Sequence, residues 1–157
     1  YSDDNGMTWN VSGRASVGGD EAKVVELNNG DILMSIRTSG KRWYNISHDG
    51  GITWNETTSE WNDLVGPARN GDMIRYDENT LLHSLPTGNS RRDVAIYIAK
   101  DEGKTWNDGK IIVPRFSAYS SMCVLPDKSI GFYVEEREVD TTSYEMVFYR
   151  LAIDSIQ

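Results

Sequence analysis

An eight-residue motif with a central carboxylate occurs three times in this chain. Its copies are SDDNGMTW at residues 2–9, SHDGGITW at 47–54 and AKDEGKTW at 99–106. Their central aspartates, Asp4, Asp49 and Asp101, are groups that can do acid–base chemistry, but an aspartate in a tight turn also accepts backbone hydrogen bonds. Because each copy adds a glycine, a threonine and a tryptophan, we interpret the motif as a turn that folds the chain rather than as a catalytic site.

Other residues that bind metals or act as nucleophiles are scarce. Cys123 is the single cysteine, so an internal disulfide or a cysteine-based zinc site is impossible. His48 and His83, the two histidines, lie in a turn-like and a strand-like run, which does not suggest metal ligands. We therefore expect no metal site and no cofactor.

Composition limits the partners. The chain of 157 residues has 24 acidic and 16 basic side chains, a net charge of −8 at pH 7. Nucleic-acid binding needs clustered positive charge, so we expect no nucleic-acid partner. No apolar run approaches the roughly 20 residues that cross a bilayer, so we expect no membrane span. A few arginines can still bind one carboxylate inside an acidic protein.

Short strands must position any functional residues. Runs rich in branched and aromatic residues, bounded by turn formers, lie between the motif copies and after the last one: 22–27, 31–38, 42–47, 71–76, 80–86, 93–99, 120–126, 129–136 and 144–153. No segment keeps a 3.6-residue period, so we expect little helix.

The spacing of the motif indicates the architecture. Its aspartates are 49 − 4 = 45 and 101 − 49 = 52 residues apart, which fits four-stranded propeller blades. Each copy closes three strands, and a fourth strand is expected after its tryptophan, including Trp9. We predict an all-β chain of about three blades. Propellers close with about four to eight blades, so residues 1–157 are expected to be the C-terminal portion of a single six-bladed β-propeller.

These motifs and the segments between them resemble the sialidase (neuraminidase) superfamily with its Asp-box (BNR) repeats. Residues 20–54 (DEAKVVELNNGDILMSIRTSGKRWYNISHDGGITW) resemble the segment with a catalytic glutamate, a binding arginine and an Asp-box. Residues 89–106 (NSRRDVAIYIAKDEGKTW) resemble the segment with the last binding arginine, and residues 117–136 (SAYSSMCVLPDKSIGFYVEE) the one with the catalytic tyrosine. The resemblance covers nearly the whole chain in the family's order.

The resemblance implies two catalytic residues. Tyr119 matches the nucleophile, and Glu21 matches the glutamate that removes its proton. A neutral hydroxyl suits this substrate, because a carboxylate nucleophile would be repelled by the carboxylate of sialic acid. Glu21 and Tyr119 are far apart in sequence, so they meet only if their strands converge at the propeller centre.

The resemblance also implies three substrate-site residues. Arg37 and Arg91 match the second and third arginines that bind the sialate carboxylate, with Arg92 as the alternative to Arg91. Glu135 matches the glutamate that orients the first arginine. The implied function is a retaining exo-α-sialidase, a glycoside hydrolase that releases terminal sialic acid from glycoconjugates, with sialylated glycans as partners.

The sequence departs from the family at several points. Asp20-Glu21 stands where Asn-Glu is common, and Arg69-Asn70-Gly71 replaces a Cys-Gln-Gly-like stretch near the sugar. The acid/base aspartate and the first arginine belong to the family's N-terminal half. We therefore expect this half as a further partner, and the isolated 157-residue chain to be inactive.

Other interpretations remain open. Each candidate has an ordinary structural role available, and Trp43 and Trp61 could stack on sugars, although core packing is the expected role. The enzyme class includes trans-sialidases and intramolecular trans-sialidases, and a non-catalytic carbohydrate-binding Asp-box propeller is the alternative outside that class. Because sialosides are displayed outside cells, a secreted, periplasmic or cell-surface location is expected.

Overall fold

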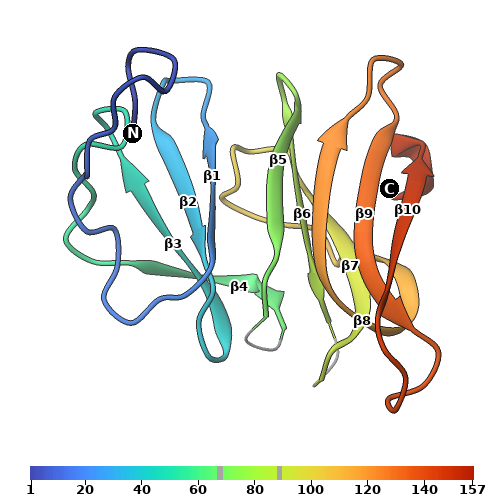
Figure 1. Cartoon of the computed structure of the whole chain (residues 1–157). Helices are drawn as coiled ribbons and strands as arrows, with labels where there is room; N and C mark the ends of the chain where they lie inside the picture. Colours follow the sequence, from blue (N-terminus) through green and yellow to red (C-terminus); the bar gives the residue numbers. More distant parts are fainter. Residues whose placement is uncertain (67–68, 88–89) are drawn as a thin grey trace.

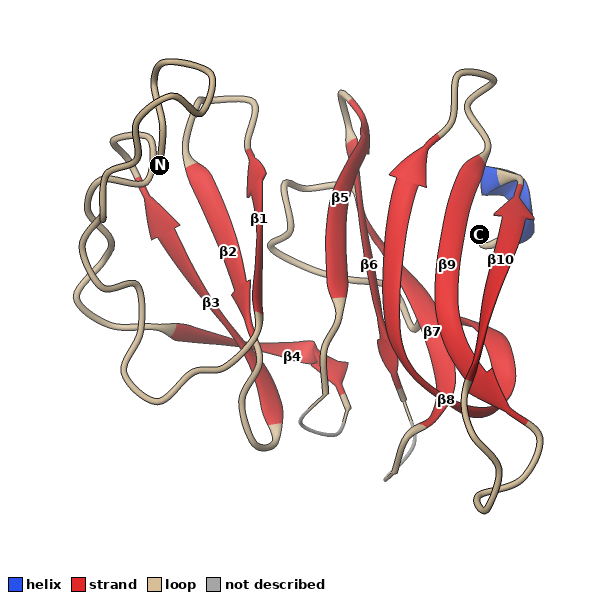
Figure 2. Ribbon diagram, viewed as in Figure 1, coloured by secondary structure: helices blue, strands red, loops and turns tan. Residues whose placement is uncertain are grey.

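Antiparallel strands follow one another along nearly the whole chain (Figure 1). The structure is a computed structural model that describes residues 1–66, 69–87 and 90–157. Its strands are β1 (Ala22–Glu26), β2 (Ile32–Ile36), β3 (Lys41–Ser47), β4 (Ser59–Val65), β5 (Asp72–Asp77), β6 (Thr80–Pro86), β7 (Arg92–Ala99), β8 (Lys110–Val124), β9 (Ile130–Arg137) and β10 (Glu145–Leu151). In the described part of the chain the one helical segment is a 3₁₀ turn, Ile153–Ser155 (Figure 2), and no helix there is long and apolar enough to cross a membrane.

The strands form two sheets. One has the order β1-β2-β3-β4, and the other has the order β10-β9-β8-β7-β6-β5. Strand β8 belongs to two blades, because its first half, up to Phe116, pairs with β7 and its second half, from Phe116 to Val124, pairs with β9. The result is two four-stranded blades and a three-stranded unit, so the prediction of an all-β chain with about three blades is confirmed.

The prediction of a fourth strand after Trp9 is wrong. Residues 10–21 are described, and they form no strand. A strand needs a neighbour to satisfy its backbone N–H and C=O groups, and none of the described strands pairs with this segment. For the same reason the Trp9 ring is 74% exposed, whereas Trp106, between two blades, is 6% exposed.

The hydrophobic cores lie between blades. One cluster joins β1, β2 and β4 to the middle blade and includes Leu33, Trp61 and Tyr97. A second cluster joins the middle blade to the last unit and includes Ile96, Phe132 and Val134. The first strands of the units are neighbours, because β1 contacts β5 and β5 contacts β8. Residues at their ends are thereby brought together from distant parts of the sequence.

Each motif aspartate accepts hydrogen bonds inside its own turn, as the turn interpretation requires. Asp49 accepts from the Thr53 N–H at 2.8 Å and from the Thr53 hydroxyl at 2.5 Å, and the Ser47 hydroxyl donates to it at 2.8 Å. Asp4 has the same three bonds in its copy. In the third copy, where Ala99 replaces the serine, Asp101 accepts an additional bond from the Lys104 N–H at 3.0 Å.

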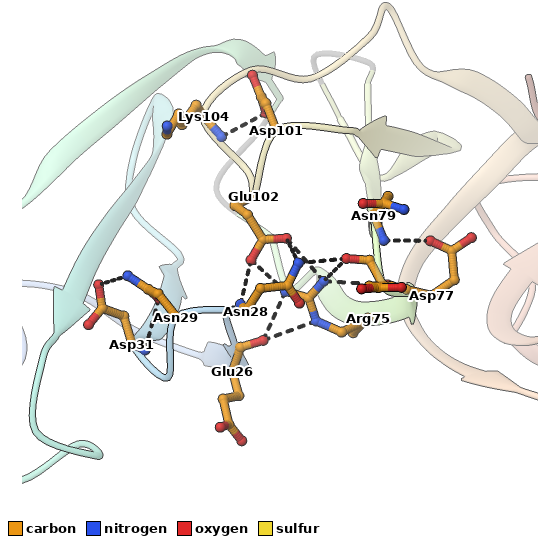
Figure 3. A network of polar contacts seen from close by, with 11 residues as sticks. Glu26, Asn28, Asn29, Asp31, Arg75, Asp77, Asn79, Asp101, Glu102 and Lys104 are labelled. Carbon is orange, nitrogen blue, oxygen red and sulfur yellow. Dashed lines mark hydrogen bonds and ion pairs between the residues drawn. The ribbon is translucent and has the colours of Figure 1, made fainter.

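The third motif also joins two blades through Glu102 (Figure 3). Its carboxylate accepts two bonds from the Arg75 guanidinium, at 2.8 and 3.1 Å, and one from the Asn28 N–H at 2.8 Å. Arg75 in turn donates to the Glu26 carbonyl oxygen at 3.0 Å. Burial would raise the pKa of Glu102, but hydrogen bonds from Arg75 and Asn28 outweigh it and hold that pKa below its ordinary value.

Glu102 has a backbone conformation that suits glycine. Its φ is +61°, and the equivalent residues of the other copies are Asn5, at +58°, and Gly50, at +72°. A side chain in this left-handed region costs about 1–2 kcal/mol. We infer that the contacts of Glu102 across the blade interface offset this cost.

Replacing Glu102 by glycine tests this balance. Glycine relieves the strain, but the charged hydrogen bonds, each contributing about 1.5–3 kcal/mol, are lost. We expect Glu102→Gly to lower the free energy of unfolding by at least about 2 kcal/mol, measured by urea titration. Asn5→Gly, at the same place in the exposed first turn, is the matched control and should not destabilise the protein. A gain in stability in Glu102→Gly would contradict the balance.

The turn aspartates should make stability depend on pH. Hydrogen bonds from the Thr53 side chain, the Thr53 N–H and Ser47 lower the pKa of Asp49 from 3.8 to about 2. Since the folded pKa is the lower one, the unfolded state binds more protons between these values, and the stabilisation is present above pH 3.8 and is lost as pH falls towards about 2. We expect Asp49→Asn to lower the melting temperature at pH 7, and the difference from the parent to shrink between pH 4 and 2. A difference that persists unchanged at pH 2 would contradict this.

Candidate active site

Glu21, Arg37 and Tyr119 form one cluster of polar contacts. The Tyr119 hydroxyl donates a hydrogen bond to Glu21 Oε1 at 2.8 Å. Arg37 Nη1 donates to Glu21 Oε2, and it donates to the Tyr119 hydroxyl oxygen at 3.2 Å. Glu21 and Tyr119 are 98 residues apart in sequence. Their contact therefore shows that the strands carrying them converge, as the pairing requires.

Strand ends position this cluster. Glu21 directly precedes β1, and Arg37 directly follows β2, its antiparallel neighbour. The Arg37 N–H donates to the Glu21 carbonyl oxygen at 3.0 Å, which continues the β1–β2 ladder to these two residues. Their side chains are thereby placed next to each other before any side-chain contact forms.

A bulge in β8 positions Tyr119. The pairing of β8 with β9 shifts register between Ser117 and Ser120, so Ala118 and Tyr119 fall within the irregularity. Bulges redirect side chains and are common beside active sites. The neighbouring Ser120 hydroxyl lies 2.8 Å from the Ser84 hydroxyl of β6, which ties the bulge to the middle blade.

Arg91 and Glu135 lie on the other side of Tyr119. The Arg91 guanidinium carbon is 5.2 Å from the centre of the Tyr119 ring, and Arg91 Nη1 is 3.6 Å from Glu135 Oε1. Glu135 Oε1 also accepts a hydrogen bond from the Tyr119 N–H at 3.2 Å. The structure therefore brings all five predicted site residues into one connected set of contacts.

Arg92 lies outside this set. Its guanidinium carbon is 4.6 Å from the centre of the Phe116 ring, and its Nε is 3.9 Å from Asp93. Arg91 therefore contacts Tyr119 and Glu135, whereas Arg92 contacts Phe116 and Asp93. The geometry favours Arg91 over Arg92 as the arginine beside Tyr119.

The charges of the cluster stabilise one another. Burial would raise the pKa of Glu21, but hydrogen bonds from Arg37 and Tyr119 outweigh it, and this pKa lies below its ordinary value. The bond to Glu21 conversely raises the pKa of Arg37. Glu21 is therefore an anion at neutral pH, in contact with the one proton of Tyr119 that it could accept.

Tyr119 also lines a cavity of about 190 Å³ with Ser120, Ser121, Tyr133 and Met146. Glu21, Arg37 and Arg91 do not line this cavity, so it is not the common depression that their assigned roles would need. Within residues 1–66, 69–87 and 90–157, no group of three or more His, Cys, Asp or Glu side chains is arranged to hold a metal ion.

The two tryptophans considered for sugar stacking differ. Trp61 is 2% exposed and stacks on Tyr44 with ring centres 4.6 Å apart, so it belongs to the core. Trp43 is partly exposed, and its indole N–H donates to Glu60 at 3.1 Å.

Sequence reasoning missed Arg42. This arginine is 5% exposed and interacts electrostatically with both Glu21 and Arg37. The available signal was weak: a charged residue at the start of the strand-like run RWYNIS, which could equally face solvent.

The fold and the site define a propeller protein with a tyrosine–glutamate pair surrounded by arginines. Comparisons with known proteins lead to the same class of protein. Residues 1–132 match the family model of the BNR repeat-like domain. A sialidase of Micromonospora viridifaciens is 32% identical over 148 residues, which cover 86% of this chain and 23% of that protein.

Solved structures agree as well. The NanB sialidase from Streptococcus pneumoniae has a TM-score of 0.85 and 25% identity, over 99% of this chain and 27% of that one. The intramolecular trans-sialidase from Ruminococcus gnavus has a TM-score of 0.79 and 24% identity, over 99% of this chain and 38% of that one. The chain belongs to the BNR repeat-like family, within the sialidase superfamily. It spans about a quarter of the length of the curated relatives that it matches.

Proposed function

We propose that this chain contributes the nucleophile half of the active site of a retaining exo-α-sialidase. The observation that carries the proposal is the 2.8 Å hydrogen bond from the Tyr119 hydroxyl to Glu21. A tyrosine needs a base to act as a nucleophile at neutral pH, and an ionised carboxylate in direct contact is such a base. Sialidases are glycosidases in which tyrosine replaces the usual carboxylate nucleophile.

In the proposed first step, the Tyr119 oxygen attacks the anomeric carbon of the sialoside while Glu21 takes the phenolic proton. The bond from this carbon to the leaving oxygen breaks, and that oxygen is protonated by an acid outside this chain. In the second step water attacks the anomeric carbon and gives one proton to the conjugate base of the outside acid, while the bond to Tyr119 breaks and Glu21 returns the proton to the Tyr119 oxygen, so two inversions give retention. Arg37, which donates to the Tyr119 hydroxyl at 3.2 Å, stabilises the negative charge that develops there.

Arg37 and Arg91 are also proposed to hold the substrate carboxylate. Both guanidinium groups contact Tyr119, one at the hydroxyl and one over the ring. A planar guanidinium binds a carboxylate through two parallel hydrogen bonds. An anion bound between them would place the adjacent anomeric carbon next to the nucleophile. Sialylated glycans are therefore the proposed partners, and these are displayed outside cells, where we propose that the enzyme acts.

The proposed active site needs a partner surface that supplies an acid and a further arginine. Apolar side chains on the outer blades are exposed and available to pack against such a partner: Val24 at 53%, Tyr133 at 44%, Met146 at 52% and Phe148 at 57%. Their exposure supports further blades of the same propeller on both sides of this chain, since blades pack face to face.

Tyr119→Phe tests the nucleophile. The change deletes one oxygen and keeps the ring, so we expect the complete natural protein that carries this chain to lose at least about 10³-fold in kcat on a fluorogenic sialoside. Its circular dichroism should be that of the parent, which would show that the fold is intact. Hydrolysis at the parent rate would overturn the proposal, and a sialylated acceptor product in place of free sialic acid would identify a transferase.

Arg91→Lys and Arg92→Lys form a matched pair. Lysine keeps the charge but loses the bidentate geometry. We expect Arg91→Lys to raise KM for the sialoside about 10–100-fold, since a hydrogen bond to a charged group contributes about 1.5–3 kcal/mol. Arg92→Lys should change KM less than about twofold, because its guanidinium stacks on Phe116. A larger rise in KM for Arg92→Lys than for Arg91→Lys would show that Arg92, and not Arg91, binds the substrate carboxylate.

A further inference from the structure

Arg42, on β3, extends through the interface between the first two blades. Its Nε donates a hydrogen bond to the Ser35 hydroxyl at 2.8 Å, and its Nη1 donates to the Arg69 carbonyl oxygen at 2.9 Å. Arg69 lies in the segment between β4 and β5. One buried guanidinium thus connects the first blade to the backbone that leads into the second.

The contacts of Ser35 continue this connection in one direction. Its hydroxyl oxygen accepts from Arg42, so its own proton is free for His83 Nε2, 2.8 Å away. His83 Nδ1 lies 3.2 Å from the Ser84 carbonyl oxygen, which can only accept, so Nδ1 carries the ring proton. Complete burial, followed by the nearby charge of Arg42, lowers the pKa of His83 well below 6.5 and keeps the ring neutral.

His83 in turn supports Gly71. A Cβ atom at this glycine would lie 2.8 Å from His83 Cε1 and 2.6 Å from the Ser84 carbonyl oxygen, which is closer than real Cβ contacts come. Gly71 is therefore seated directly on the histidine. Arg42 thus binds the backbone at Arg69, and Gly71 packs closely against His83 and the Ser84 carbonyl oxygen.

The same guanidinium lies close to the candidate active site. Arg42 is attracted by Glu21 and repelled by Arg37. Burial first, and then Arg37, lower the pKa of Arg42 to about 10, so it remains a cation at neutral pH. Ile36 of β2 pairs with Trp43 of β3, so Arg37 and Arg42 are the next residues along these two neighbouring strands. The Arg69 carbonyl oxygen, which Arg42 binds, therefore lies near the end of β2 that Arg37 follows.

The arrangement is costly for stability. Within the described residues, Nη2 of Arg42 is buried without a hydrogen-bond partner. Burying a charge costs free energy unless all of its donors are paired, so stability would not select a guanidinium with an unpaired nitrogen. Stability alone gives no reason for an arginine here.

We propose that Arg42 is a positioning residue of the candidate active site, and that it holds the Arg69–Gly71 segment in place beside Glu21 and Arg37 as part of the substrate-binding surface. The role in substrate binding rests on the proposed function. The role of Arg42 in holding residues 69–71 does not, because it can be tested without measuring turnover. It predicts that Arg42 acts on substrate binding through residues 69–71 and not on the chemical step.

Arg42→Met and Arg42→Lys in the complete natural protein test this. We expect Arg42→Met to raise KM for a fluorogenic sialoside about 10–100-fold, because small displacements of binding groups have effects of this size, with kcat changed much less. Amide hydrogen exchange at residues 69–71 should become faster by a larger factor than in the strands of the same blades. Arg42→Lys keeps the charge but cannot make both hydrogen bonds together. Its KM and its exchange rates should therefore lie between those of the parent and those of Arg42→Met.

Arg75→Met is the matched control. Arg75 also bridges the first two blades, but it lies with Glu102 at the opposite end of β2 from Arg37, about 20 Å away for six residues of strand. We expect Arg75→Met to lower the melting temperature and to leave KM for the sialoside unchanged. The proposal is overturned if Arg42→Met keeps the parent KM, or if it loses stability like Arg75→Met with unchanged exchange at residues 69–71. If the parent protein does not hydrolyse sialosides, the proposed function fails, and the exchange rates alone decide whether Arg42 holds the segment.

Discussion

The carboxylate of Asp72 connects the first strands of all three blade units. It is 4% exposed at the start of β5, and its Oδ2 accepts a hydrogen bond from the Met122 N–H of β8 at 2.5 Å. Its Oδ1 lies 3.5 Å from Lys23 Nζ of β1. A buried carboxylate must be paired, so these strands can adopt only positions that satisfy it. Glu21 and Tyr119 lie two and three residues from these partners, and their separation depends on this contact.

Strand β8 adds the second constraint. Because one continuous strand pairs with β7 and then with β9, the middle blade and the last unit cannot move independently. The change of partner occurs at Phe116, which pairs with both strands, and the register of β8 against β9 shifts just beyond it, between Ser117 and Ser120. Tyr119 lies in this irregularity, which redirects the side chain proposed as the nucleophile. Covalent continuity through the bulge makes its position a property of the fold rather than of a mobile loop.

The two ends of the blades have different tasks. At one end the repeated turns close each unit, and Glu102 and Arg75 join neighbouring blades by charged hydrogen bonds. At the other end lie Glu21 and Arg37, with the buried Arg42 on the neighbouring strand β3. Strong structural contacts are thereby kept about one strand length from the proposed chemistry. Arginine serves both ends, because its rigid set of donors can hold several acceptors at once.

The sequence alone determined the strands, the turns and the blade period, since these depend on local patterns: alternating apolar residues, and an aspartate, glycine and threonine at fixed spacing. Resemblance to a family named Glu21, Arg37, Arg91, Tyr119 and Glu135 in advance. Only the tertiary structure decided that these five touch, that Arg91 rather than Arg92 faces Tyr119, and that the first turn has no following strand. Only it showed Arg42 to be buried beside them. These facts depend on contacts between residues far apart in the chain and on whether a neighbouring strand is present, and no local pattern encodes either.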